Sequence, residues 1–144
     1  MEELIGVFST ENSQGLINRE NGGEFSASTT QNGKKICHLL TNFKTASFKC
    51  FELTIYCNYT TEKILCLFSG VDSSLSAKIN VLGKNGDQTF SLKYMNGEIF
   101  VEANSNTTML EVRLKPLFGL LFSDIVMKID NNADLSNAVE LAIF

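Results

Sequence analysis

The sequence contains no tryptophan and only one histidine, His38, among its 144 residues. A Ser-His-Asp or Cys-His catalytic site would have to use His38, and the adjacent Cys37 points to the opposite face of a strand. The chain also lacks the indole ring that often stacks against bound sugars. We therefore expect a non-enzymatic protein that works by binding or assembly, with a small enzyme based on surface carboxylates as a distant alternative.

The chain also lacks basic runs and long apolar runs. The longest apolar run, at 117–122, is interrupted by Gly119 and is far shorter than the roughly 18 residues of a membrane helix. The first residues, MEELIGVFSTENS, have neither a basic region nor a long apolar core, so we expect no signal peptide. The net charge of −4 disfavours nucleic acid and anionic membranes as partners. These absences predict a soluble, cytoplasmically made protein with no nucleic-acid partner and no membrane insertion.

Patterns that would hold a metal or a cofactor are missing or incomplete. In DNNADLSNAVEL, Asp130, Asn132 and Asp134 match the first ligand positions of a calcium loop, but Leu135 replaces the turn glycine and Leu141 the bidentate glutamate. No phosphate-binding or dinucleotide-binding glycine motif occurs. The cysteines form no C-x-x-C pair and are expected to be buried free thiols; they are Cys37, Cys50, Cys57 and Cys66. We predict no metal site and no cofactor.

Alternation of apolar and polar residues is what the sequence does show. In KINVLGKNGDQTFSLKYMNGEIFVEA, at 78–103, two Asn-Gly pairs each suit a two-residue type I′ turn with positive φ at both positions. Two tight turns would place Phe90, Leu92 and Tyr94 on one buried face, which predicts a three-stranded antiparallel meander. The predicted partners are Val81 with Phe90, Ile79 with Leu92, Tyr94 with Ile99, and Leu92 with Val101.

Further strands are expected along the rest of the chain, at 34–42, 48–59, 63–68, 109–115, 124–130 and 138–144. Five alternate side chains of 48–59 should face inward: Phe51, Leu53, Ile55, Cys57 and Tyr59. KILCLF, at 63–68, is typical of a strand covered on both faces. Pro116 should end the strand at 109–115, because proline cannot donate a hydrogen bond within a sheet. Roughly eight or nine short strands predict an all-β fold, a barrel or, as we prefer, an antiparallel jelly-roll-like β-sandwich. Residues 1–33 are polar and are expected as an arm or irregular edge beside a single domain at 34–144.

Two outward-facing aromatic residues are the candidates for ligand contact. In the predicted meander, Phe100 shares the outer face with Lys93 and Lys78, and Tyr56 faces outward from the strand at 48–59. A flat ring beside lysines suits a sugar, a peptide or, less well, a nucleic-acid base. Single surface aromatics are also ordinary. Tyr56, Phe100, Lys93 and Lys78 are therefore our candidate ligand-binding residues.

The segment KPLFGLLF, at 115–122, is too apolar for an open loop on a soluble monomer. It could form a strand and turn buried between two sheets, or it could form a contact between subunits. Because the open edges of β-sheets also tend to pair, a homo-oligomer is favoured. The candidate interface residues are Leu117, Phe118, Leu120, Leu121 and Phe122.

The order of these stretches resembles the β-sandwich domains at the tips of phage tail fibres and baseplates. The resemblance is carried by GKKICHLLTNFKTASFKCFELTIYCNYTTEKILCLFSG, SAKINVLGKNGDQTFSLKYMNGEIFVEA and MLEVRLKPLF, over about residues 33–130. It implies a homotrimer in a virion, made in the host cytoplasm, that adheres to a host-surface glycan or protein. It assigns no binding residue by position. The alternative is a monomeric carbohydrate- or peptide-binding module of cellular origin.

Overall fold

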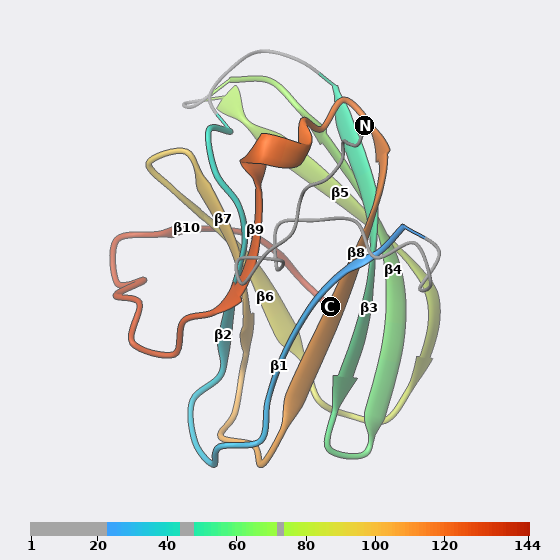
Figure 1. Cartoon of the computed structure of the whole chain (residues 1–144), viewed down its shortest axis with the longest axis vertical. Coiled ribbons are helices and arrows are strands. Elements are labelled where there is room, and N and C mark those ends of the chain that lie inside the picture. Colours follow the sequence, from blue (N-terminus) through green and yellow to red (C-terminus); the bar gives the residue numbers. More distant parts are fainter. Residues whose placement is uncertain (1–22, 44–47, 72–73) are drawn as a thin grey trace, which may run out of the picture.

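Ten antiparallel strands make up the fold of the residues that the computed structural model describes, which are 23–43, 48–71 and 74–144 (Figure 1). The first sheet has the strand order β1-β8-β3-β4-β5 and the second has the order β10-β6-β7-β2-β9. The strands are β1 (Phe25–Thr29), β2 (Ile36–Leu40), β3 (Lys49–Cys57), β4 (Thr60–Ser69), β5 (Ser76–Asn85), β6 (Phe90–Met95), β7 (Glu98–Ala103), β8 (Leu110–Phe118), β9 (Ile125–Ile129) and β10 (Val139–Ile143). The predicted all-β antiparallel sandwich is confirmed. The nested pairs β1–β8 and β2–β7 lie in opposite sheets, and β3 pairs with β4 and β8.

The core lies between the two sheets and is filled mainly by alternate side chains of the strands. In β3, the apolar residues from Phe51 to Cys57 are fully buried, while Glu52, Thr54 and Tyr56 face outward and are half-buried. Phe90 and Leu92 of the second sheet close the core from the other side. This follows from the two-residue period of a strand, which the sequence displays directly.

Of the two predicted hairpins, one is correct and one is wrong. β6 pairs with β7 in the expected register, and Asn96 and Gly97 both have positive φ, at 51° and 85°. β5, in contrast, pairs with β4, so that Val81 lies opposite Ile64 instead of Phe90. The chain crosses from the first sheet to the second after β5. At this crossover Gly86 packs so closely that a Cβ would lie 2.3 Å from Thr60 Oγ1.

Pro116 does not end its strand, contrary to expectation, because β8 continues to Phe118. The register with β3 shifts at this point: Phe51 lies opposite Pro116 and Cys50 lies opposite Phe118, so Leu117 is the additional residue of a bulge. β1 follows β8 only as far as Leu114. A proline without an N–H group is tolerated at such a bulge, because β1 no longer pairs with β8 at Pro116.

Burial differs from the prediction at two further places. β4 alternates: Ile64 is buried, whereas Leu65 and Leu67 lie on the outer face and are half-buried. Tyr59 lies in the turn after β3 and is 98% exposed, because β3 ends at Cys57 and Asn58 has a φ of 55°. KILCLF is therefore covered on one face only.

The predicted N-terminal arm contributes to the sandwich. Residues 25–29 form the edge strand β1, and Phe25 is buried in the main core. Residues 1–22 lie outside the described residues.

Candidate functional site

The four predicted ligand-binding residues do not form one site. Lys78 lies on β5 in the first sheet, opposite Leu67 of β4, because β5 does not pair with β6. Phe100 and Lys93 lie opposite each other on β7 and β6 of the second sheet. The predicted row of Lys78, Lys93 and Phe100 therefore does not exist.

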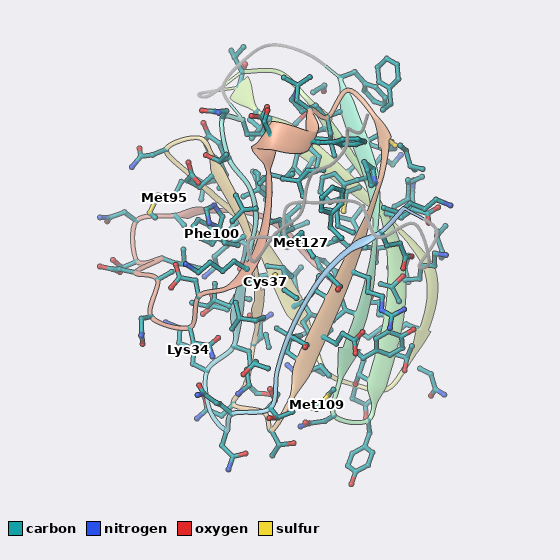
Figure 2. The ribbon with its side chains drawn as sticks, in the orientation of Figure 1. Lys34, Cys37, Met95, Phe100, Met109 and Met127 are labelled. Atoms are coloured by element: carbon teal, nitrogen blue, oxygen red, sulfur yellow. The ribbon has the colours of Figure 1, made fainter. Side chains whose placement is uncertain are left out.

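Phe100 is buried, with only 4% of its surface exposed, so the expected exposed ring is wrong. It stacks on the His38 ring at a centroid distance of 4.5 Å and an interplanar angle of 19°. Ile36 and Leu135 complete a small second core on the outer face of this sheet. Figure 2 shows Phe100 and Met95 on the side of the sheet where the segment between β9 and β10 passes. That segment supplies Leu135 and covers the ring.

Lys93 and Tyr56 are both engaged by neighbours on their own sheets. Lys93 Nζ donates a hydrogen bond to Glu102 Oε1 at 2.8 Å. Tyr56 is half-buried on the outer face of β3, with the Arg113 guanidinium carbon 5.9 Å from its ring centroid. Arg113 Nε in turn donates to Glu111 Oε2 at 2.8 Å. Neither residue presents an isolated platform.

His38 has hydrogen-bonding partners of its own. Its Nε2 lies 2.6 Å from Glu98 Oε1 and 3.1 Å from the carbonyl oxygen of Leu40. Thr41 Oγ1 donates to the other oxygen of Glu98 at 2.8 Å. A carboxylate that orients an imidazole occurs in acid–base sites, but here the adjacent thiol of Cys37 is buried in the main core. The arrangement satisfies a half-buried histidine beside the second core.

The cysteines are free and buried, as predicted. Burial raises the pKa of the Cys37 thiol to about 12 and also raises the pKa of Cys66. Reactive cysteines need a lowered pKa, so these thiols belong to the packing of the core. Within the described residues, no cluster of three or more His, Cys, Asp or Glu side chains could hold a metal ion.

The polar groups of the calcium-like segment stabilise the backbone instead. Asn131 Oδ1 accepts a hydrogen bond from the Ile36 backbone N–H at 2.8 Å. Asp134 Oδ1 accepts one from the Ser136 N–H at 3.0 Å, and the hydrogen bonds from Ser136 lower the pKa of Asp134. The polar side chains of this segment therefore hold the backbone of the connection that covers Phe100.

A buried acidic residue, Glu62, was not predicted. It occupies an inward position of β4 and is 1% exposed. Lys84 Nζ lies 3.3 Å from its Oε1, but neither carboxylate oxygen accepts a well-formed hydrogen bond from the described residues. Burial raises the pKa of Glu62 above its ordinary value, and the Lys84 ammonium lowers it by a smaller amount. Glu62 lies two and six residues before Ile64 and Phe68, so the alternation of the strand places all three on the same inward face. This alternation is the sequence feature that could have predicted the burial of Glu62.

Five exposed apolar side chains lie at one end of the sandwich, and we call this group the end patch. Its side chains are between 45% and 65% exposed, and they are Phe48, Leu117, Phe118, Leu121 and Phe122. They lie just before β3, at the bulged end of β8, and at the start of the 3-10 turn η4 (Phe122–Asp124), the orange coil at the top of Figure 1. The interpretation of the segment at 115–122 as buried between the sheets is wrong for its four exposed residues, which are Leu117, Phe118, Leu121 and Phe122. Leu120 alone of the five predicted interface residues packs partly against the main core.

Defined contacts hold the end patch in place. Lys49 is buried, and its Nζ donates to the Gly119 carbonyl oxygen at 2.9 Å. Gly119 has a φ of 79°, and a Cβ there would lie 2.3 Å from the Phe48 carbonyl oxygen. The Phe48 and Phe118 rings lie 5.7 Å apart, and the segment borders a hollow of about 340 Å³. These contacts therefore hold the backbone that carries the apolar side chains of the end patch in one conformation.

A second hollow, of about 300 Å³, is polar. It is lined by Lys34, Glu102, Ala103, Asn104, Ser105 and Asn106. Ser91 Oγ donates to Asn104 Oδ1 at 3.0 Å, and Lys34 Nζ lies 3.9 Å from Glu102. Amide, hydroxyl and carboxylate groups of this kind suit a hydroxyl-rich ligand. The polar stretch EANSN, at 102–106, is the sequence feature that corresponds to this hollow.

Comparison with protein-family models, curated proteins and solved structures found no match to this chain. In the part of the chain that the structure describes, no helix is both long enough and apolar enough to cross a membrane. The surfaces of the sandwich are therefore the features that bear on its function.

Proposed function

We propose that this chain is a non-enzymatic structural or receptor-binding module, of the kind carried by phage tail fibres and baseplates, whose copies associate through the end patch. The observation that carries the proposal is the exposure of five large apolar side chains at one end of the sandwich. Soluble monomers rarely expose a contiguous apolar patch of this sort, and aromatic side chains are enriched at the centres of interfaces.

The energetics favour moderate association. Covering the exposed half of a phenylalanine contributes roughly 2 kcal/mol, at about 25 cal/mol per Å² of apolar surface. The end patch holds three such rings and two leucines, which together offset a cost of association of roughly 4–15 kcal/mol. We expect self-association at micromolar protein concentrations, with a trimer as the assembly.

The viral assignment rests on the sandwich fold together with the resemblance of the strand order to tail-fibre and baseplate domains. Because one fold can host many functions, the viral assignment depends on what the surfaces of the sandwich bind. In a virion, the end patch would join the copies, and the remaining faces would meet a host-surface glycan or protein.

The mass of the full chain in solution tests the proposal. Sedimentation equilibrium should give a multiple of the 15.9 kDa chain mass, and Phe118→Glu or Leu121→Glu should reduce it to the monomer. Tyr59→Glu is the matched control, because Tyr59 is exposed but lies outside the end patch. A wild-type chain that stays monomeric up to about 100 μM, far above a typical 1 μM dissociation constant, would overturn the proposal.

The polar hollow favours a second candidate, a monomeric carbohydrate- or peptide-binding module. Its amide and hydroxyl groups could pair with ligand hydroxyls, with Asn104 and Asn106 at its wall. A glycan array comparing the wild type with Asn106→Ala tests it, and Asn132→Ala, in the calcium-like segment, is the control. Binding that Asn106→Ala leaves unchanged would exclude the hollow as the site.

A further inference from the structure

The chain enters the fold beside the hollow of the end patch. Gly23, the first residue that the structure describes, lines this hollow together with Phe118. Two residues further on, the Phe25 ring lies 5.9 Å from the Phe122 ring of the end patch. The stretch at 1–22 is therefore joined to the sandwich at the edge of the end patch itself.

The segment EELIGVF, at 2–8, has a composition that suits this surface. It begins with two glutamates and continues with four large apolar residues around a glycine, which are Leu4, Ile5, Val7 and Phe8. The link at 9–22 contains only two large apolar residues, Leu16 and Ile17. Grooves and pockets bind short peptide segments by receiving their apolar side chains, and the hollow of about 340 Å³ offers such a place.

The charges beside the hollow match the glutamates of this segment. Lys115 lines the hollow and is exposed, and it forms no ion pair with any residue that the structure describes. Asp124, the acid at the same end of the sandwich, is already engaged, because its Oδ1 accepts a hydrogen bond from Asn42 Nδ2 at 3.1 Å. Opposite charges across a contact fix its register, so Lys115 favours an acidic partner segment.

We infer that the segment at 2–8 of one copy binds the end patch of the next copy. This inference rests on the self-association proposed above and names what the end patch meets. The exchange of an identical element between copies is a low-cost route to an oligomer. The apolar side chains of the segment cover the exposed rings of the end patch, and its glutamates lie toward Lys115.

The link at 9–22 is long enough for this exchange. At roughly 3.5 Å per residue it spans at most about 50 Å. A compact chain of 144 residues has a radius of gyration of about 15 Å, so the segment reaches a neighbouring copy. Each copy then gives one segment and receives one. Such a heterologous contact closes into the proposed trimer when neighbours are related by a rotation of about 120°.

Substitutions in the full chain test the inference. Leu4→Glu with Phe8→Glu alters the segment and leaves the end patch intact, and this variant should be monomeric by sedimentation equilibrium where the wild type associates. Leu16→Glu with Ile17→Glu is the matched control, because it adds the same two charges in the link, and it should keep the wild-type mass. A segment variant as heavy as the wild type or heavier would overturn the inference and leave self-association through the end patch standing. A monomeric wild type would overturn both.

Mixing two variants tests whether the contact joins different copies. Phe118→Glu with Leu121→Glu alters the end patch and leaves the segment at 2–8 intact. Mixed in equal amounts with the segment variant, it should form a one-to-one dimer and nothing larger, because each pair retains one intact segment and one intact end patch on different chains. A mixture that stays monomeric would contradict the exchange.

A disulfide provides a second test that does not depend on charges placed in the end patch. Phe8→Cys with Leu121→Cys, oxidised mildly, should give dimers and trimers on a non-reducing gel, since the four native cysteines are buried. Leu16→Cys with Leu121→Cys is the control and should form such species much more slowly. An internally linked monomer as the sole product would show that the segment binds its own chain, which would overturn the contact between copies.

Discussion

Glu62 and Lys84 lie opposite each other on β4 and β5, and the Nζ of Lys84, on the exposed edge strand, is 3.3 Å from the Oε1 of the buried Glu62. The pair stands immediately beyond the bulge at Leu82, where the register of the two strands shifts. An ion pair with a buried member adds little net stability, because the desolvation of the charges offsets their attraction. The pair lies near the end of β5, just before the chain crosses to the second sheet.

Replacing the buried acid should stabilise the fold. Glu62→Leu is expected to raise the free energy of unfolding by about 1–4 kcal/mol at pH 7, because a buried carboxylate is exchanged for an apolar side chain. Since the pKa of Glu62 is raised in the folded state, the wild type is stabilised as the pH falls through that pKa toward 4.5. The gain from Glu62→Leu should therefore be largest at neutral pH and shrink in acid. Urea unfolding at several pH values measures it, and a gain that grows in acid would contradict it.

Removing the other partner should have the opposite effect. Lys84→Met leaves the Glu62 carboxylate buried without its cation and should lower the free energy of unfolding by about 3 kcal/mol at pH 7. The double variant Glu62→Leu with Lys84→Met should recover most of this loss. If the effects of the two single substitutions simply add in the double variant, the two side chains are not coupled.

Local patterns in the sequence were reliable where both partners are close in the chain. The Asn96-Gly97 turn joins β6 and β7 directly, and its predicted register is the observed one. Asn85-Gly86 looks the same in the sequence, but the preceding strand already has a long apolar neighbour in β4, with which it pairs from Ser69 to Thr61. Competition between a near and a distant partner cannot be read from alternation alone, because both registers place the same residues inward.

The predicted site failed for a related reason. Alternation correctly placed Phe100 on the face opposite Val101, but it does not reveal whether another segment covers that face. Leu135, about 35 positions along the chain, supplies the cover. The apolar segment at 117–122 was recognised from its composition, and only the structure shows that four of its leucine and phenylalanine residues stand outside the core.

Phe100 should now behave as a core residue. Phe100→Ala is expected to lower the free energy of unfolding by about 3 kcal/mol, because it removes the ring that packs on His38, Ile36 and Leu135. Tyr56→Ala, on the outer face of the first sheet, should cost about 1 kcal/mol or less. Thermal or urea unfolding of both variants provides the comparison. An equal loss in the two variants would contradict the second core.

The thiols should be protected while the chain is folded. Raising the pKa of Cys37 from 9.0 to about 12 lowers its thiolate fraction about a thousandfold, and burial also blocks access to the reagent. A disulfide reagent at pH 8 should therefore label none of the four cysteines quickly in the native state and all four in guanidinium. Rapid labelling of Cys37 in the folded chain would show that the second sheet opens at β2.

Gly119 should be required both for stability and for the end patch. Its φ is 79°, and a Cβ at this position would lie only 2.3 Å from the Phe48 carbonyl oxygen, so there is no room for a side chain. Gly119→Ala should lower the free energy of unfolding by about 2–3 kcal/mol. It should also weaken self-association, since Phe118 and Leu121 flank the displaced residue. Gly83→Ala is the matched control, because a Cβ at Gly83 meets nothing within 4 Å and should change stability by no more than about 0.5 kcal/mol. Urea unfolding measures the stability of the two variants, and sedimentation measures their self-association. A Gly119→Ala chain with wild-type stability and mass would contradict the prediction, because the backbone would then accommodate a Cβ at this position.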